Sequence, residues 1–268
     1  MAHILQIDDP ADPRVAAYRD IKERDLVGRQ GLFIAEGETV LRAFARDAPE
    51  RIESLLIDGK RADKLADLFA ALPPATPVYS VGQAVLDAVA GFHLHRGVLA
   101  VGRKPAPLSP ADLLAAAPAR AVVLVLAGIA NHDNLGGIYR NAAAFGAAGV
   151  ILDSECCDPL YRKAIRVSVG AALSVPTARL APGEDVMALL AAQGFEALAL
   201  TPSATRTLAE LVPSARTAVL LGAEGPGLSA DLIARATAVG IPMASGFDSL
   251  NVATTSGVVL HHLRFAAR

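Results

Sequence analysis

The clearest signal in the chain is a run near its end, Ile241-Pro242-Met243-Ala244-Ser245-Gly246-Phe247-Asp248-Ser249-Leu250-Asn251-Val252-Ala253. It reads as the end of a strand followed by the start of a helix, which we expect to begin near Leu250 and to run to about residue 266. Ser249 is well placed to cap this helix. The polar side chains exceed what a turn requires, and α/β proteins bind ligands where parallel strands end. The run therefore predicts a ligand site.

The part of the chain before this run alternates short apolar strands with helical segments. Such alternation is typical of a parallel sheet that helices cover on both faces, with functional loops after the strands. We expect strands at residues 122–127, 150–152, 197–200, 218–221 and 239–241, and helices at residues 135–147, 159–173, 184–193, 230–236 and 250–266. The sequence thus predicts an α/β fold for this part of the chain.

The first part of the chain mixes shorter elements and predicts a smaller α/β sandwich. Three prolines between Lys104 and Pro110 favour an extended connection, and the next segment is either a short helix or more of that connection. The expected domains are therefore residues 1–104 and residues 119–268, with a linker at 105–118. Within the first domain we expect strands at residues 33–35, 52–57, 77–80 and 97–101, and helices at 13–28, 38–48 and 61–72.

Composition excludes several classes of protein. The chain has 268 residues, 53% of them hydrophobic, and a formal net charge of -2, which does not suit a globally basic nucleic-acid coat. The adjacent Cys156 and Cys157 lack the spacing of a zinc site and favour a reducing compartment. No secretory signal is visible, and the longest apolar run, Ala121–Ala130, is too short to cross a membrane. We therefore expect a cytoplasmic protein without a membrane segment or a bound metal.

Two further segments carry polar residues after an expected strand. The first, Asn134-Leu135-Gly136-Gly137-Ile138-Tyr139-Arg140-Asn141-Ala142, offers Asn134 as a helix cap and Arg140 as a fork of donors for phosphate or carboxylate. The second is the glycine-rich loop Gly222-Ala223-Glu224-Gly225-Pro226-Gly227-Leu228-Ser229, in which Glu224 is expected to pair with Arg140. The Gly225-x-Gly227-x-x-Ala230 spacing resembles a dinucleotide fingerprint, but Glu224 would repel a pyrophosphate.

Together the three segments resemble the three motifs of the SpoU (TrmH-type) RNA 2′-O-ribose methyltransferases, within the SPOUT superfamily. The resemblance covers the chain from about Val122 to its end, and Arg166–Ala171 is similar to the segment that connects the motifs. More loosely, Phe33–Gly37 and His95–Ala100 resemble an N-terminal domain often found in this family. One departure is visible, since many relatives have an Asp-Pro pair where this chain has Asn131-His132-Asp133.

The resemblance implies a deep trefoil knot in the C-terminal domain and an N-terminal domain that shares its fold with some ribosomal proteins. It also implies methyl transfer from S-adenosylmethionine to a ribose 2′-hydroxyl of rRNA or tRNA, without a metal, by a homodimer formed through the C-terminal domain. The residues it assigns to the donor are Thr201, Gly222, Ile241, Met243 and Leu250. Those it assigns to catalysis and substrate are Asn134, Arg140, Glu224, Ser249 and Asn251.

Three other interpretations stay open at this point. A non-catalytic RNA-binding protein could keep the fold, although retention of all five polar site residues argues against it. A small-molecule enzyme could bind a dinucleotide through the Gly225 loop. A metal site could use His93, His95 and the two cysteines, but their spacing is poor for this purpose.

Overall fold

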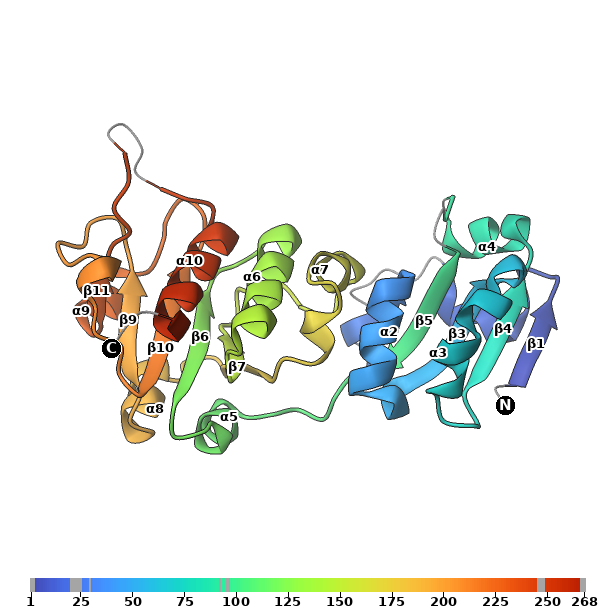
Figure 1. Ribbon diagram of the computed structural model, residues 1–268, viewed down its shortest axis with the longest axis horizontal. Coiled ribbons are helices and arrows are strands. Elements are labelled where there is room, and N and C mark those ends of the chain that lie inside the picture. Colours follow the sequence, from blue (N-terminus) through green and yellow to red (C-terminus); the bar gives the residue numbers. More distant parts are fainter. Residues whose placement is uncertain are drawn as a thin grey trace. The chain divides into compact units, whose positions relative to one another are not determined.

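The computed structural model describes residues 3–19, 26–28, 30–91, 93–94, 97–244 and 249–265. It divides into two compact units (Figure 1). Unit 1 consists of Met1–Ala106 and Pro159–Ser174, and unit 2 consists of Pro107–Asp158 and Val175–Arg268. The chain therefore passes between the two units three times.

Unit 1 is built on a five-stranded mixed sheet. In spatial order its strands are β1 (His3–Ile7), β4 (Pro77–Val81), β3 (Ile52–Asp58), β5 (Val98–Arg103) and β2 (Leu32–Glu36). β1, β4 and β3 run parallel, whereas β5 is antiparallel to both of its neighbours. The helices are α2 (Glu38–Asp47), α3 (Ala66–Ala70) and α4 (Gln83–Ala90), with 3₁₀ turns at Pro13–Tyr18, Pro49–Arg51, Gly59–Arg61 and Asp63–Leu65.

Both faces of this sheet are covered. Along β3, Leu55 and Ile57 belong to one buried cluster and Leu56 to another. Successive side chains of a strand point to opposite faces, so these two clusters are the cores on the two sides of the sheet.

Helix α7 (Arg162–Val167) belongs to unit 1, although in the sequence it lies between strands of unit 2. The carboxylate of Glu36, at the end of β2, lies 3.5 Å from Nε of Arg162 and 3.6 Å from Nη1 of Arg166. A 3₁₀ turn, Ala171–Leu173, follows the helix. The apolar side chains that this segment adds to the core of unit 1 are Leu160, Ile165 and Leu173.

Unit 2 contains a six-stranded sheet in which all strands are parallel, as expected for the C-terminal part of the chain. In spatial order the strands are β11 (Thr237–Val239), β9 (Glu196–Leu200), β10 (Arg216–Gly222), β6 (Ala121–Ala127), β7 (Gly149–Leu152) and β8 (Thr177–Arg179). The helices are α5 (Pro110–Ala116), α6 (His132–Phe145), α8 (Val186–Ala192), α9 (Ala230–Ala234) and α10 (Val252–Phe265), with a 3₁₀ turn at Leu208–Glu210.

Helices α6 and α10 approach each other very closely (Figure 1). A Cβ atom added to Gly137 would lie only 2.7 Å from the Cβ atom of Ala253. The amide of Asn141 donates to the carbonyl oxygen of Ala253 at 2.7 Å and to Oγ of Ser256 at 2.9 Å. These contacts join the middle of α6 to the first two turns of α10.

Several elements differ from the expected ones. Helix α5 is the short helix that was one of the two expectations for its segment, and its Leu113 and Leu114 are buried in the core of unit 2. Helix α6 begins at His132, where Asn131 is the cap and accepts from the backbone N–H of Asp133, so Asn134 is not the cap. The strands β1 and β8 and the helix α4 had not been expected. Both strands are short edge strands that lack a long apolar run.

Candidate functional site

A cavity of about 410 Å³ lies where β9, β10 and β11 end. Since these strands are parallel, their carboxyl ends meet at one edge of the sheet, which is where such sheets bind ligands. The walls come from the segments that follow the three strands and from the first turn of α10. The lining residues include Thr201, Gly222, Glu224, Ile241, Met243, Ser249, Leu250, Asn251 and Thr255.

Gly222 ends β10 and allows the next loop to fold back over the strand. A Cβ atom at this position would lie 2.2 Å from the carbonyl carbon of Gly227 and 2.4 Å from the backbone nitrogen of Leu228. The loop closes where the N–H of Gly227 donates to the carbonyl of Ala223 at 3.0 Å. Gly227 has a φ of +70°, a region that glycine adopts without strain. This tight turn presents Glu224 to the first turns of α6 and α10.

Three side chains from three separate segments form one hydrogen-bonded network. Nδ2 of the buried Asn134 donates to Oε1 of Glu224 at 2.7 Å. Nδ2 of Asn251 donates to Oδ1 of Asn134 at 2.8 Å and to the same carboxylate oxygen at 3.3 Å. The network therefore ties the start of α6, the loop after β10 and the start of α10 to one another at the wall of the cavity.

A second network holds the loop that leads into α6. Oδ2 of Asp153, which follows β7, accepts from the N–H of Gly128 at 2.9 Å. Sγ of Cys156 accepts from the N–H of Ile129 at 3.2 Å and donates to the carbonyl of Leu126 at 3.3 Å. The loop after β7 thus fixes the loop after β6, just before Asn134 enters the site.

Arg179, in β8, supports the same loop. Its Nη1 donates to the carbonyl oxygens of Asp153 and Cys156 at 2.6 and 2.9 Å, and its Nη2 donates to that of Cys157 at 3.2 Å. A planar guanidinium satisfies three acceptors at fixed angles, which the single ammonium of lysine does less well. Arg179 does not line the cavity, so it acts on the site by positioning the chain.

The structure brings together every expected site residue except Arg140. All five residues assigned to the donor line the cavity, as do Glu224, Ser249 and Asn251, and Asn134 joins them through hydrogen bonds. Arg140 is exposed on α6, and its guanidinium has no hydrogen bond or ion pair to any described residue.

The expected pair between Glu224 and Arg140 is therefore wrong. Glu224 accepts from the amides of Asn134 and Asn251 instead. The reason is helix geometry, because Arg140 follows Asn134 by six positions and so points about 120° away from it around α6.

The expected cap of the last helix is also wrong. Helix α10 begins at Val252, and Oδ1 of Asn251 accepts from the backbone N–H groups of Ala253 and Thr254 at 2.9 and 3.2 Å. Asn251 is therefore the capping residue, while Ser249 lies two residues earlier and lines the cavity. Ser245 and Asp248, two other polar residues of this run, lie outside the described residues.

Sequence reasoning missed three residues that support the site. Asn141 follows Asn134 by seven positions, so helical periodicity places both on the face of α6 that meets α10. Asp153 directly follows a strand, as the expected site residues do. Arg179 lies in a three-residue strand, and nothing in its local sequence marks its role.

The two cysteines are free thiols, and they serve the fold. Burial raises the pKa of the Cys156 thiol to about 12 and that of Cys157 to about 11, so both stay protonated at neutral pH. Within the described ranges, no three His, Cys, Asp or Glu side chains lie close enough to hold a metal ion, and His95 falls outside these ranges. Among the helices that could be searched, none is both long and apolar enough to span a bilayer.

Known proteins resemble this chain in both sequence and fold. Residues 121–261 match the SpoU rRNA Methylase family. An uncharacterised tRNA/rRNA methyltransferase of Mycobacterium tuberculosis is 40% identical over 270 residues, which cover 96% of this chain and 91% of the relative. The 23S rRNA (guanosine-2′-O-)-methyltransferase RlmB of Vibrio vulnificus is 30% identical over 231 residues, covering 84% and 93%.

The fold is also that of a solved structure. The AdoMet-bound rRNA methyltransferase from Sinorhizobium meliloti superimposes with a TM-score of 0.82, at 24% sequence identity, over 97% of each chain. The family match covers more than half of the chain, and its motifs meet at one cavity. This chain therefore belongs to the SpoU rRNA methylase family.

Proposed function

We propose that this protein transfers a methyl group from S-adenosylmethionine to the 2′-hydroxyl of a ribose in rRNA or tRNA. The observation that carries the proposal is the network of Asn134, Glu224 and Asn251, which joins three segments at the wall of one cavity. Membership of the SpoU rRNA Methylase family and the likeness to a 23S rRNA 2′-O-methyltransferase support the same reaction class.

The cavity suits the methyl donor in size and lining. Its volume of about 410 Å³ lies in the usual range for small-molecule sites, and its walls combine apolar side chains with backbone groups at strand ends. Backbone groups of Gly222, Ile241 and Leu250 would hold the adenosine end, with Thr201 and Met243 beside them. When bound, the donor supplies a methyl group on a sulfonium, which is reactive without a metal.

The polar network holds the segments of the site in place. Asn134, Glu224 and Asn251 keep the starts of α6 and α10 and the loop after β10 at a fixed spacing. Fixed walls allow a ribose hydroxyl to approach the methyl group in line, which supplies much of the rate enhancement in such transfers. Ser249, at the cavity wall, is placed to contact the substrate.

Arg140 acts on the RNA. A guanidinium group has hydrogen-bond donors and no acceptor, so Arg140 does not accept the proton of the hydroxyl. It is exposed and is not engaged by other described residues, which leaves its donors available to an RNA phosphate beside the target ribose. From there its charge stabilises the negative charge that develops on the 2′ oxygen, while the hydroxyl proton passes to water.

Tritiated methyl incorporation into bulk RNA tests the proposal. We expect the unmodified protein to incorporate label and Arg140→Ala to lose about 100-fold or more in rate, the scale of losing one charge-stabilising donor. Thermal stabilisation by S-adenosylmethionine should be unchanged in Arg140→Ala, because the residue does not line the cavity. Arg206→Ala, which removes another exposed arginine, is the matched control.

Each contrary result has a distinct meaning. Loss of both methylation and donor binding in Arg140→Ala would assign a structural role to the residue. RNA binding by the unmodified protein without any incorporation would indicate a non-catalytic RNA-binding protein. Stabilisation by NAD and not by S-adenosylmethionine would favour the dinucleotide enzyme.

The active form that we propose is a homodimer joined through unit 2. An apolar surface on α10 supports this, since Val258 and Phe265 are 40% and 63% exposed. The ring of His261 lies beside that of Phe265, with a centroid distance of 5.2 Å. A partner packed on this surface would bring its Arg140 toward a cavity other than its own.

Light scattering after gel filtration tests the dimer. We expect twice the chain mass for the unmodified protein and the monomer mass for Val258→Asp, because a buried charge at the contact is costly. Asp in place of Val212, which is also exposed and lies in unit 2 but not on α10, should leave the dimer intact. A monomeric unmodified protein would contradict the proposal.

Three finer features complete the proposal. The C-terminal segment forms a trefoil knot through which α10 passes. In support of the knot, the chain returns from the edge strand β11 and places α10 against α6, beside the central strand β6. Unit 1, with a fold shared with some ribosomal proteins, binds the RNA largely by shape and phosphates. The protein works in the cytoplasm, in keeping with two free thiols.

A further inference from the structure

A second cavity in unit 2 lies apart from the proposed methyl-donor cavity. It measures about 390 Å³ and lies where β6 and β10 begin. The proposed methyl-donor cavity lies where β10 ends, and a seven-residue strand spans about 20 Å. The two cavities are therefore separate sites at opposite ends of the same parallel strands.

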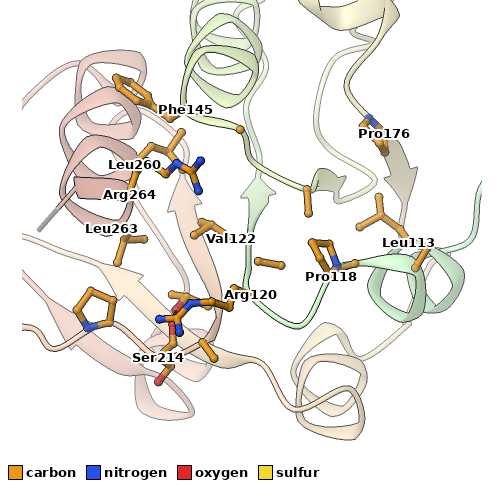
Figure 2. A pocket seen from close by; sticks show the side chains of 18 of the residues that line it. Leu113, Pro118, Arg120, Val122, Phe145, Pro176, Ser214, Leu260, Leu263 and Arg264 are labelled. Carbon is orange, nitrogen blue, oxygen red and sulfur yellow. Dashed lines mark hydrogen bonds between the residues drawn. The ribbon is translucent and has the colours of Figure 1, made fainter. Parts of the chain in front are cut away.

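The wall of this second cavity is largely apolar. It is formed by the segment after α5, by the C-terminal ends of α6 and α10, and by the segment before β10 (Figure 2). Side chains that supply apolar surface are Leu113, Pro118, Val122, Phe145, Leu260 and Leu263. Its volume and lining are those of a small-molecule site rather than of a flat surface.

Two arginines at this cavity carry charges that the protein does not neutralise. Arg120 and Arg264 both line it, yet neither guanidinium has a hydrogen bond or an ion pair with any residue that the structure describes (Figure 2). No aspartate or glutamate is among the lining residues. The nearby ends of α6 and α10 contribute only partial negative charges, so the cavity keeps an excess of positive charge.

Unit 2 engages some of its arginines in the fold and leaves others, Arg140 among them, without a partner among the described residues. Arg216 donates to the carbonyl of Leu114 at 2.6 Å and stacks on the ring of Phe195 at 4.4 Å. Arg235 forms an ion pair with Asp185, with nitrogen and oxygen 2.7 Å apart. These side chains are used by the fold, whereas Arg120 and Arg264 are left available to a ligand.

We propose that this cavity binds a nucleoside monophosphate unit. A guanidinium fork matches a phosphate group, and two forks at one apolar cavity suit an anion with an apolar, flat body. The half-buried ring of Phe145 provides a surface on which a base can stack. The hydroxyl of Ser214 donates to Glu196, and the hydroxyl of Thr217 donates to the carbonyl of Ser214. Both hydroxyl oxygens keep lone pairs that can accept from the amino group of a base.

Such a unit has two sources, a free nucleotide or one unpaired nucleotide of an RNA strand. The recognition chemistry is the same for both, so the experiment distinguishes them. Binding of AMP, CMP, GMP and UMP is measured by calorimetry, and binding of a labelled single-stranded pentanucleotide RNA by fluorescence anisotropy. S-adenosylmethionine is present at saturation throughout, so that nucleotides cannot report on the proposed donor cavity.

Four variants of the full chain localise the binding. We expect Arg120→Ala and Arg264→Ala each to weaken it about tenfold or more, and Arg206→Ala, an exposed arginine outside both cavities, to leave it unchanged. Val122→Phe should abolish binding by filling the cavity. Both arginine side chains are exposed, so Arg120→Ala and Arg264→Ala should leave the unfolding temperature unchanged. An unchanged unfolding temperature is the evidence that these two variants are folded.

Every outcome decides the proposal. Tight binding of mononucleotides that both arginine variants weaken supports a free-nucleotide site. Binding of the pentanucleotide alone, weakened in the same way, supports a site for an RNA strand. The absence of binding by all probes, or binding that Arg120→Ala, Arg264→Ala and Val122→Phe leave intact, would overturn the proposal, whether or not the protein methylates RNA.

Discussion

Asn134 shows how much of the site depends on one side chain. Its amide nitrogen donates to Glu224 and its amide oxygen accepts from Asn251, so it needs a donor and an acceptor at the same time. Aspartate has the same shape but no donor, and leucine has neither. Few side chains can therefore join these three segments, which explains why an asparagine is buried at the start of a helix.

Gly222→Ala is expected to destroy the cavity wall, because the added Cβ atom would lie 2.2 Å from the backbone of Gly227. The loop that carries Glu224 must then move, so we expect donor binding to fall by at least tenfold, measured by calorimetry. Gly82→Ala is the matched control, since its Cβ atom meets nothing within 4 Å. Donor binding that survives Gly222→Ala unchanged would show that this loop is not part of the site.

The buried thiols predict a loss of stability in alkali. The pKa of Cys156 is raised from 9.0 to about 12 in the folded protein, so the folded state holds its proton more tightly than the unfolded state does. The resulting stability is present below pH 9 and is lost as the pH rises toward 12. The denaturation midpoint in urea should fall more steeply over this range for the unmodified protein than for Cys156→Ala.

Residue-level prediction failed where side-chain direction mattered. Thr201, Gly222 and Ile241, which the family resemblance assigned to the donor, lie at or after strand ends and line the cavity. The expected pair of Glu224 and Arg140 rested on their opposite charges. The side of α6 from which a side chain projects determines its partner instead. The seven-residue spacing of Asn134 and Asn141 already indicated which side of the helix faces the site.

At the level of elements, the pair of helices α6 and α10 positions the network. Both helices begin at the edge of the sheet where the cavity lies, and Gly137 allows their backbones to approach. Their contact fixes Asn134 relative to Asn251, because each residue lies within or directly before the first turn of its helix. The distance between two helices thus sets the geometry of three hydrogen bonds.

Gly137→Ala should separate these helices, since its Cβ atom would lie 2.7 Å from that of Ala253. Overpacking of this kind costs about 1–3 kcal/mol, and we expect methylation to fall with it. The double variant Gly137→Ala, Ala253→Gly restores the space and should recover both the unfolding temperature and the rate. If the double variant is no better than the single one, the contact between the helices does not control the site.

Element prediction was accurate for long elements and poor for short ones. The strands β6 and β10 were found because each contains a continuous run of apolar residues, most of them buried. The strand β8 has three residues after a proline and gives no such run. Helix α7 was found approximately, but its partner was not, because packing against β2 is a contact between segments more than a hundred residues apart.

At the level of the whole molecule, the two units do not follow one another along the chain. Unit 1 takes Pro159–Ser174 from the middle of unit 2, and this segment completes its core. Sequence composition marked a boundary near residue 104 through its prolines, and the first unit does end its main segment at Ala106. Composition has no comparable signal for an inserted segment, since both of its ends lie in ordinary loops.

A fragment of residues 1–106 should therefore be markedly less stable than unit 1 in the full chain. It lacks Leu160, Ile165 and Leu173, each no more than 5% exposed, and a buried side chain of this size contributes about 1.5–3 kcal/mol. A synthetic peptide of residues 159–174, added to the fragment, should raise its urea midpoint. A shuffled peptide is the control, and a fragment that gains nothing from the correct peptide would contradict the assignment.

The insertion of α7 also has a consequence for biosynthesis. As the nascent chain leaves the ribosome, the strands of unit 1 emerge first, yet their apolar face stays incomplete until residue 174 has appeared. At translation speeds of about 5–20 residues per second that interval lasts roughly 3 to 14 s. During it the β2 edge and its neighbours are open to chaperones, while β6 and β7 of the other unit are already outside. The N-terminal unit, although its main segment is made first, cannot mature until part of the other unit has also been synthesised.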